Sequence, residues 1–470
     1  MTVRAASPTR DVAMTRILAQ VAWFPELRFG PRAKAGERKG SERKDGERRD
    51  GDAVPESALA SAIEAATIRH WLTSETIARS LCTRPWLEVQ PEVRAALLVG
   101  VTQLFQMPRE PDHAVVDDAV RWTRGRLQQG AGGFVNAVLR KAIALRGERV
   151  DGGAATAWWE RRDAIPCPDG SLVLLTHEML PADPLARLGA QTSHPVALVT
   201  RWAAKRGIET ARQFAAHSLM EMPITLHDGA SVTSVAGAAR APWVDHGEPH
   251  DCEGHFVWQG SVKALSEVLA AHPSLIVQDP ASARAVESTR DLAPKRILDA
   301  CAGRGTKAVQ LALAHPNAEV WATDTDEARL AALRQRATGV ANLRVVDLVE
   351  LGTLPAHFDL MLLDVPCSNT GVLARRLEAR YRFNDRSLSE VTQLQRGIAE
   401  HHRGLVAKGG VIVWSTCSLE PAENADQAKW LARLVKGRVI SESEWLPRGG
   451  PGDPPRSCTD GSYHARIVLP

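Results

Sequence analysis

Residues 296–307 read RILDACAGRGTK, an apolar run that passes through two glycines into residues able to start a helix. This pattern predicts a buried strand, a tight turn and a helix, in that order. Gly303 and Gly305 would let backbone amides approach a ligand closely, with the helix N-terminus pointing at it. A Gly-x-Gly pair is equally typical of a turn that binds nothing, so the neighbouring segments decide between the two interpretations.

Four further apolar segments follow, separated by segments with helical periodicity. Alternation of this kind predicts βαβ units, a parallel sheet and a ligand at the carboxyl ends of the strands. Asp324 stands about 20 residues after the glycine turn, where an acid that hydrogen-bonds a ribose is expected. Asp347 and Asp364 end the next two strands, although a row of solvated acids is the simpler alternative. The segments are 318–324 (AEVWATD), 343–347 (LRVVD), 358–366 (FDLMLLDVP) and 410–417 (GVIVWSTC).

Two cysteines follow adjacent predicted strands. Cys367 lies in DVPCSNTG (364–371), and Cys417 lies in STCSLEPAEN (415–424). A lone cysteine at a strand end is usually a small buried hydrophobe. Two of them, each in a polar turn at neighbouring strand ends, are expected to lie near each other and near the Asp364 carboxylate. A basic cluster follows the first motif at Arg375, Arg376, Arg380 and Arg382.

Residues 276–470 resemble the Sun/Fmu-type RNA (cytosine-5)-methyltransferases. The motifs of that family read close to D-A-C-A-A-P-G-G-K, D-A-P-C-S-x-T-G and A-T-C-S-x-x-x-x-E-N. Both cysteine motifs occur here in order and at the right distance. The resemblance implies an α/β, Rossmann-like class I methyltransferase domain with S-adenosyl-L-methionine as its cofactor and RNA as its substrate.

The resemblance also implies roles for individual residues. Cys417 would be the nucleophile that adds to carbon 6 of cytosine, Cys367 would assist product release, and Asp364 would hydrogen-bond the base. Arg304 departs from the family motif by replacing a proline, and Thr306 departs from it by replacing a glycine. The residues implied to contact the cofactor are Cys301, Ala302, Gly303, Arg304, Gly305, Thr306, Lys307, Asp324, Asp347 and Asp364.

The N-terminal part carries apolar residues at helical spacing from 57 to 146, which predicts an all-helical domain. RAALLVGVTQLFQMPREPDHAVVDDAV (94–120) and GAGGFVNAVLRK (130–141) resemble the NusB-like domain of bacterial 16S ribosomal RNA methyltransferases of the RsmB type. The resemblance implies that residues 1–150 form an RNA-binding domain and that the substrate is 16S ribosomal RNA.

The remaining segments complete the expected domain organisation. Residues 31–56 are a near-repeat of charged residues, which predicts a disordered insertion or, alternatively, an arm that touches RNA. Residues 151–193 predict an irregular linker with one short strand in SLVLLTHEML, and 194–277 predict a small α/β subdomain before the methyltransferase domain at 278–470. Within that subdomain the chain reads LHDG at 226–229, where relatives carry Arg-x-Asn.

Composition narrows the class of protein without deciding its function. A net charge of +3 over 470 residues is too small to establish nucleic-acid binding. Seven cysteines, without an export signal or ligand-spaced pairs, argue against a disulfide framework and a structural zinc site. No apolar run approaches the roughly 18 residues of a membrane span. We therefore expect a cytoplasmic monomer that binds neither membrane nor metal.

Three alternatives stay open at this point. A DNA cytosine-5 methyltransferase would use Cys367 as its Pro-Cys nucleophile, but that class lacks a partner like Cys417. A nicotinamide-dependent oxidoreductase needs a third glycine in its fingerprint, where this chain has Lys307 and Ala308. An RNA-binding scaffold with a degenerate cofactor loop would be separated from an enzyme by measuring S-adenosylmethionine binding.

Overall fold

The computed structural model describes residues 8–27, 58–152, 157–229, 246–353 and 358–470. The charged segment at 31–56 lies outside these residues. The chain divides into two compact units, which are described separately. Unit 1 comprises Met1–Leu219 with Arg376–Arg382, and unit 2 comprises Met220–Arg375 with Phe383–Pro470.

Unit 1 is built on a bundle of helices, as the helical periodicity predicts. Helix α4 lies at its centre, because residues on all sides of it are buried. Leu97, Val101 and Phe105 of α4 share one apolar core with residues of the surrounding helices. The helices are α1 (Pro8–Val21), α2 (Ala58–Arg69), α3 (Trp71–Leu81), α4 (Pro91–Gln106), α5 (Asp112–Arg124) and α6 (Gln129–Leu145).

The described residues of the segment expected to be an irregular linker contain regular structure that belongs to unit 1. These residues include two short strands and a helix, and helices α8 and α9 of the expected 194–277 subdomain also belong to unit 1. Pro184 occupies the first turn of α7, where proline is tolerated, and Asp183 caps that helix by accepting from the Ala186 amide at 2.7 Å. The elements are β1 (Arg146–Asp151), β2 (Ala164–Pro166), β3 (Ser171–Leu175), α7 (Pro184–Thr192), α8 (Val196–Arg206) and α9 (Ile208–His217).

Unit 2 opens with a small antiparallel sheet in the order β5-β6-β4-β7. Its strands are short and contain both apolar and polar residues. Helix α10 packs apolar side chains against Leu226 and Trp258. The elements are β4 (Ile224–Asp228), β5 (Gly247–Pro249), β6 (His255–Trp258), α10 (Val262–Ala271) and β7 (Leu275–Val277).

The rest of unit 2 is a seven-stranded sheet in the order β10-β9-β8-β11-β12-β14-β13. The first five strands in this order are parallel, and β14 pairs antiparallel with both β12 and β13. The chain order reverses between β8 and β11, which is the switch point where open α/β sheets bind ligands. The strands are β8 (Arg296–Asp299), β9 (Glu319–Ala322), β10 (Leu343–Val345), β11 (Phe358–Asp364), β12 (Val406–Thr416), β13 (Arg438–Trp445) and β14 (Ser462–Val468).

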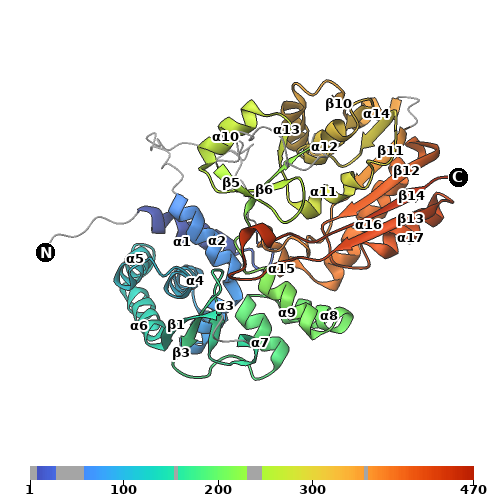
Figure 1. Cartoon of the computed structure of the whole chain (residues 1–470). Coiled ribbons are helices and arrows are strands. Elements are labelled where there is room, and N and C mark those ends of the chain that lie inside the picture. The colour runs from blue at the N-terminus through green and yellow to red at the C-terminus, as the bar shows by residue number, and fades with distance from the viewer. Residues whose placement is uncertain (1–7, 28–57, 153–156, 230–245, 354–357) are drawn as a thin grey trace, which may run out of the picture. The chain divides into compact units, whose positions relative to one another are not determined.

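Helices cover both faces of this sheet (Figure 1). Leu360 and Leu362 of β11 pack with residues of α11 and α12, whereas Met361 and Leu363 pack with residues of α16 and α17. Burial on both faces explains why β11 is a continuous apolar run. The architecture confirms the predicted Rossmann-like fold. The helices of unit 2 include α11 (Pro280–Glu287), α12 (Thr306–Ala314), α13 (Glu327–Ala337), α14 (Leu348–Thr353), α16 (Asp385–His402) and α17 (Ala425–Leu434).

Helix α15 (Ala379–Arg382) lies within residues 376–382, all of which belong to unit 1. Arg380 is buried there and donates to the carbonyl oxygens of Thr192 at 3.3 Å and Ser218 at 2.9 Å. Among the described residues, none of the helices is both long enough and apolar enough to cross a membrane.

Candidate active site

The switch point of the large sheet brings three polar loops to one edge. Strand pairing sets Leu362 beside Asp299 and sets Asp364 beside Ser415, so that β8, β11 and β12 end together. The glycine turn follows β8, the Cys367 loop follows β11, and the Cys417 loop follows β12. The juxtaposition expected from the sequence is therefore present.

The two cysteines are in direct contact. Their sulfur atoms lie 3.2 Å apart, and both residues are partly exposed free thiols. Cys417 also donates to Asn369 Oδ1 at 3.3 Å, while Asn369 Nδ2 donates to the Cys367 carbonyl at 2.9 Å. Asn369 has a φ of +62°, a left-handed conformation that asparagine tolerates better than most residues. Its side chain thus bridges both cysteine loops.

The environment of Cys367 favours its neutral form. The hydrogen bond with Cys417 raises the pKa of Cys367 well above its usual value, and burial and the charge of Glu423 act in the same direction. Nucleophilic attack by a cysteine requires the thiolate. Cys367 stays a thiol, so Cys417 is the better candidate for the nucleophile.

Lys307 and Asp364 form an ion pair beside the thiols. Lys307 Nζ lies 2.8 Å from Asp364 Oδ2, and Ser415 Oγ donates to Asp364 Oδ1 at 2.8 Å. Burial acts to lower the pKa of Lys307, but the charge and hydrogen bond of Asp364 raise it overall, with a smaller contribution from Cys417. The lysine is therefore a fixed positive charge close to the Cys417 sulfur.

Asp299 is a site residue that sequence reasoning did not select. It is fully buried, and its carboxylate oxygens accept no hydrogen bond of normal geometry from the described residues. Burial and the nearby Asp364 charge raise the pKa of Asp299 to about 8, against the opposing effect of Lys307. At neutral pH the protonated form is therefore favoured. The only signal in the sequence was its position as the last residue of the strand before the glycine turn.

Glu423 holds the two cysteine loops together. It is fully buried, and burial raises its pKa although its hydrogen bonds oppose this effect. Its Oε1 accepts from the Ser368 amide at 2.8 Å and from Gln395 Nε2 at 3.0 Å, and its Oε2 accepts from the hydroxyls of Ser368 and Ser418 at 2.5 Å each. One carboxylate thus fixes the residue after each cysteine. Glu423 belongs to the quoted E-N motif, but the sequence did not show what it touches.

We predict that Glu423→Ala destabilises the protein and loosens the cysteine pair. The substitution leaves buried donors of Ser368, Ser418 and Gln395 without their acceptor, which costs about 3 kcal/mol or more in unfolding free energy. Urea unfolding measures this change, with the exposed Glu400→Ala as the matched control. A variant as stable as the control would mean that Glu423 is not the anchor of these loops.

The loop after β8 has the geometry of a turn that presents its backbone to a ligand. Gly303 has a φ of +57° and Gly305 a φ of +88°. A Cβ on Gly305 would lie 2.6 Å from Leu333 Cδ1, whereas one on Gly303 would meet nothing within 4 Å. Gly305 is thus required for packing, and Gly303 faces an open side. Helix α12 starts at Thr306 and adds its N-terminus.

The residues of this loop fit an adenosine-containing cofactor. Asp324 Oδ2 accepts from the Gly303 amide and Oδ1 from the Asp326 amide, both at 2.9 Å, which fixes the carboxylate at the end of β9 beside the turn. The Ala302 amide donates to the Thr323 carbonyl at 2.9 Å. A carboxylate has lone pairs left to accept from ribose hydroxyls. Cofactor contact by these residues stays a prediction.

The two departures from the family motif are compatible with this geometry. Arg304 is exposed, and Thr306 is a half-buried residue in the first turn of α12, so neither distorts the turn. Cys301 is mostly buried, and burial raises the pKa of its thiol strongly, so it is an inert residue of the loop. Asp347 is exposed and caps α14 by accepting from the Glu350 amide at 2.8 Å. None of its hydrogen bonds to the described residues links Asp347 to the other predicted cofactor residues.

The basic cluster after the first cysteine motif is only partly available to RNA. Arg375 is engaged within unit 2, where it lies 3.0 Å from Asp279 and 2.6 Å from Asp460. Arg380 is buried in unit 1. The sequence suggested four equivalent basic residues, whereas two of them have structural roles.

Two family models match parts of the chain. Residues 290–443 match the family model described as 16S rRNA methyltransferase RsmB/F, and residues 18–144 match the NusB family. The chain is 27% identical over 354 residues to the probable ribosomal RNA small subunit methyltransferase B of Bacillus subtilis, covering 72% of this chain and 71% of the relative.

Another relative and a solved structure agree with these matches. The ribosomal RNA small subunit methyltransferase B of Yersinia pseudotuberculosis is 31% identical over 231 residues, or 46% of this chain, and the match spans 54% of that relative. The crystal structure of PH0851 superposes with a TM-score of 0.61 at 19% identity, covering 88% of this chain and 91% of the other. That likeness shows the shared fold.

Proposed function

We propose that this chain methylates carbon 5 of a cytosine in 16S ribosomal RNA, with S-adenosylmethionine as the methyl donor, because it joins a segment that matches the NusB family to one that matches the RsmB/F methyltransferase family. The reaction runs through a covalent bond between Cys417 and the base. The contact of 3.2 Å between the two sulfur atoms carries this proposal, because one thiol can attack while the other serves the later elimination.

The first step makes carbon 5 reactive. Carbon 5 of cytosine is a weak nucleophile, and addition of the Cys417 thiolate to carbon 6 converts the ring into an enamine. The new C6–S bond takes the sulfur electron pair, and carbon 5 gains the electron density. Asp364 can accept from the exocyclic amino group and hold the ring in place, while Lys307 pairs with Asp364 at 2.8 Å and fixes its orientation. Bound S-adenosylmethionine supplies an electrophilic methyl group.

The second step releases the product. A base removes the proton from carbon 5, the electron pair of that C–H bond restores the ring double bond, and the C6–S bond breaks. Cys417 leaves as a thiolate, next to the neutral Cys367 thiol. The Cys367 S–H donates to the departing sulfur and stabilises its negative charge.

The substrate assignment rests on the relatives and on the N-terminal domain. Both curated relatives described above carry the name ribosomal RNA small subunit methyltransferase B, and unit 1 contains the NusB match. Enzymes that modify a base act on unstacked or flipped nucleotides, which suits a second domain that holds the RNA.

Bisulfite mapping tests this function directly. The purified chain is incubated with S-adenosylmethionine and 16S ribosomal RNA from cells that lack the gene, and methylated cytosines are read as bisulfite-resistant positions. We expect one cytosine to become bisulfite-resistant, and we expect the same position to remain sensitive when the enzyme is omitted. Methyl incorporation without a protected cytosine would show that another atom is methylated and would contradict the cytosine-5 assignment.

A substitution at the end of β9 tests the cofactor site. We predict that Asp324→Ala weakens S-adenosylmethionine binding by roughly 1.5 to 3 kcal/mol, because ribose hydroxyls lose a charged acceptor. Isothermal titration calorimetry measures the change, and Glu319→Ala, which removes an exposed acid at the other end of β9, is the matched control. Equal affinity of Asp324→Ala and wild type would remove Asp324 from the site. No binding to the wild type would favour the RNA-binding scaffold.

A further inference from the structure

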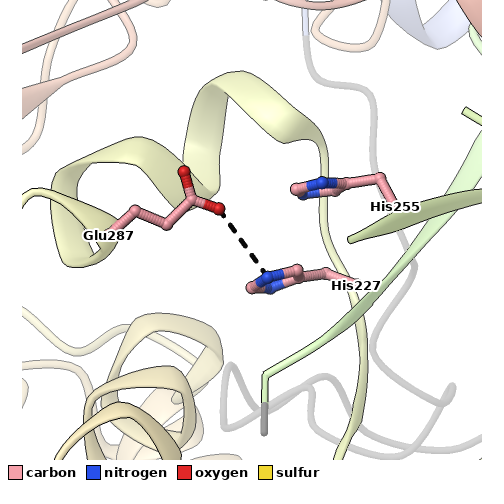
Figure 2. Close-up of side chains that lie close together, drawn as sticks. All are labelled: His227, His255 and Glu287. Atoms are coloured by element: carbon pink, nitrogen blue, oxygen red, sulfur yellow. Dashed lines mark ion pairs between the residues drawn. The ribbon is translucent and has the colours of Figure 1, made fainter. Parts of the chain in front are cut away.

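Three side chains in unit 2 converge away from the cysteine pair. His227 comes from β4, His255 from β6 and Glu287 from the end of α11, and Figure 2 shows them gathered around one point. One donor atom of each residue lies within 4.8 Å of the other two. The two imidazole rings are stacked with centroids 4.4 Å apart, and His227 Nε2 lies 3.7 Å from Glu287 Oε1.

Hydrogen bonds fix which nitrogen of each ring carries a proton. His255 Nδ1 lies 2.9 Å from the Glu253 carbonyl, which can only accept, so Nδ1 is protonated. His227 Nδ1 lies 3.1 Å from Gln278 Oε1, and the Gln278 amide is oriented by its Nε2, which donates to Gln310 Oε1 at 2.7 Å. Both Nε2 atoms therefore carry lone pairs when the rings are neutral.

The cluster holds acceptors without a donor between them. His255 is 4% exposed, and its Nε2 has no hydrogen-bond partner in the described parts of the chain. The Nε2 of a neutral His227 cannot donate to the Glu287 carboxylate. A cation bound among the two nitrogen lone pairs and the carboxylate would satisfy all three acceptors, and a buried acceptor without a partner is costly.

Both imidazoles are buried, which disfavours a charged ring and leaves nitrogen donors available. Neutral imidazoles whose Nδ1 atoms donate to oxygen are the form in which histidine binds metals.

We propose that His227, His255 and Glu287 bind a divalent transition metal ion of the zinc type. Two imidazole nitrogens and a carboxylate suit zinc, with bonds of about 2.0 to 2.2 Å and donor atoms roughly 3.4 Å apart in a tetrahedral site. The donor atoms must close in slightly from their present spacing. Glu287 can make this movement because its side chain is 33% exposed, which also gives an entry path. A water molecule takes the fourth position.

Nearby positive charges weaken this site without blocking it. The positive charges of Arg284 and Arg290 act on His255 and His227, respectively, and would repel a bound cation. The guanidinium of Arg284 is stacked 3.6 Å from the centroid of the Trp445 ring, and Arg290 donates to the Gly229 carbonyl at 3.3 Å. The cluster is not visible in the sequence, because Glu287 is distant from both histidines along the chain and none of the three lies in a metal-binding motif.

Cobalt and zinc titrations of the full chain test the proposal. The protein is stripped with a chelator, and cobalt is added while visible absorption is recorded. We expect one equivalent to give the d–d bands of a tetrahedral site without a thiolate charge-transfer band. Zinc competition against a chromophoric chelator then gives the affinity. We expect His255→Ala and Glu287→Gln each to lower it at least tenfold, a loss of about 1.4 kcal/mol.

Controls separate this site from adventitious binding and from the proposed function. His315→Ala removes another buried histidine of unit 2, which bonds Thr289 at 2.9 Å, and it should bind zinc like the wild type. Glu287→Gln disturbs packing least, and circular dichroism checks that each variant is folded. No bound equivalent in the wild type, a thiolate band, or unchanged affinity in both folded cluster variants would overturn the proposal. None of these measurements depends on methyl transfer.

Discussion

The variant Cys417→Ala is expected to lose methyl transfer and to form no covalent adduct with RNA, while its affinity for S-adenosylmethionine stays unchanged. Without the thiolate no C6–S bond forms, and carbon 5 keeps its low nucleophilicity. Removing the nucleophile of a covalent mechanism lowers the rate by about four orders of magnitude or more. The cofactor loop after β8 is a separate segment, so binding should persist.

A denaturing gel and methyl incorporation measure the two losses. Each variant is incubated with ribosomal RNA and S-adenosylmethionine, and an adduct survives denaturation as a slowly migrating band. Cys82→Ala, which removes a half-buried thiol of unit 1, is the matched control and should behave like the wild type. Normal product formation by Cys417→Ala would contradict the covalent mechanism at this residue.

The sequence predicts five of the seven strands of the large sheet but not β13 or β14, which pair antiparallel with each other. The central strands β11 and β12 are buried on both faces. Such strands appear as uninterrupted apolar runs, as in 358–364, and each ends in a polar turn that is visible in the sequence. Position at a strand end then brings Cys367, Cys417 and Asp364 together, since adjacent parallel strands end at one edge. Between Ala164 and Thr192 the sequence predicts the strand that corresponds to β3, but it does not predict β2 or α7, because runs of three to nine residues carry too little periodicity.

The sequence could not reveal the contacts that depend on burial. Asp299 and Asp347 both end apolar runs, yet Asp299 is enclosed at the centre of the sheet and Asp347 is exposed beyond its edge strand. The difference comes from strand order, because β8 is central and β10 is terminal. The hydrogen bonds that Glu423 accepts from Ser368 also join segments that are remote in the chain.

The variant Cys367→Ala is expected to accumulate the covalent adduct that Cys417→Ala cannot form. Cys417 can still attack carbon 6, because its own sulfur, Lys307 and Asp364 are intact. Alanine removes the thiol 3.2 Å from the Cys417 sulfur, so the departing thiolate loses its hydrogen-bond donor. Elimination becomes the slow step. The gel should show a band that grows with time and requires S-adenosylmethionine.

The state of the trapped base decides whether Cys367 acts after methyl transfer. Digesting the protein of the adduct and analysing the attached nucleotide should reveal a methyl group on the base. Cys367→Ser retains a donor and should release product faster than Cys367→Ala. An adduct without the methyl group would place Cys367 before transfer. A band for Cys417→Ala with none for Cys367→Ala would reverse the two roles, since the Pro-Cys sulfur would then be the nucleophile, as in the DNA enzymes.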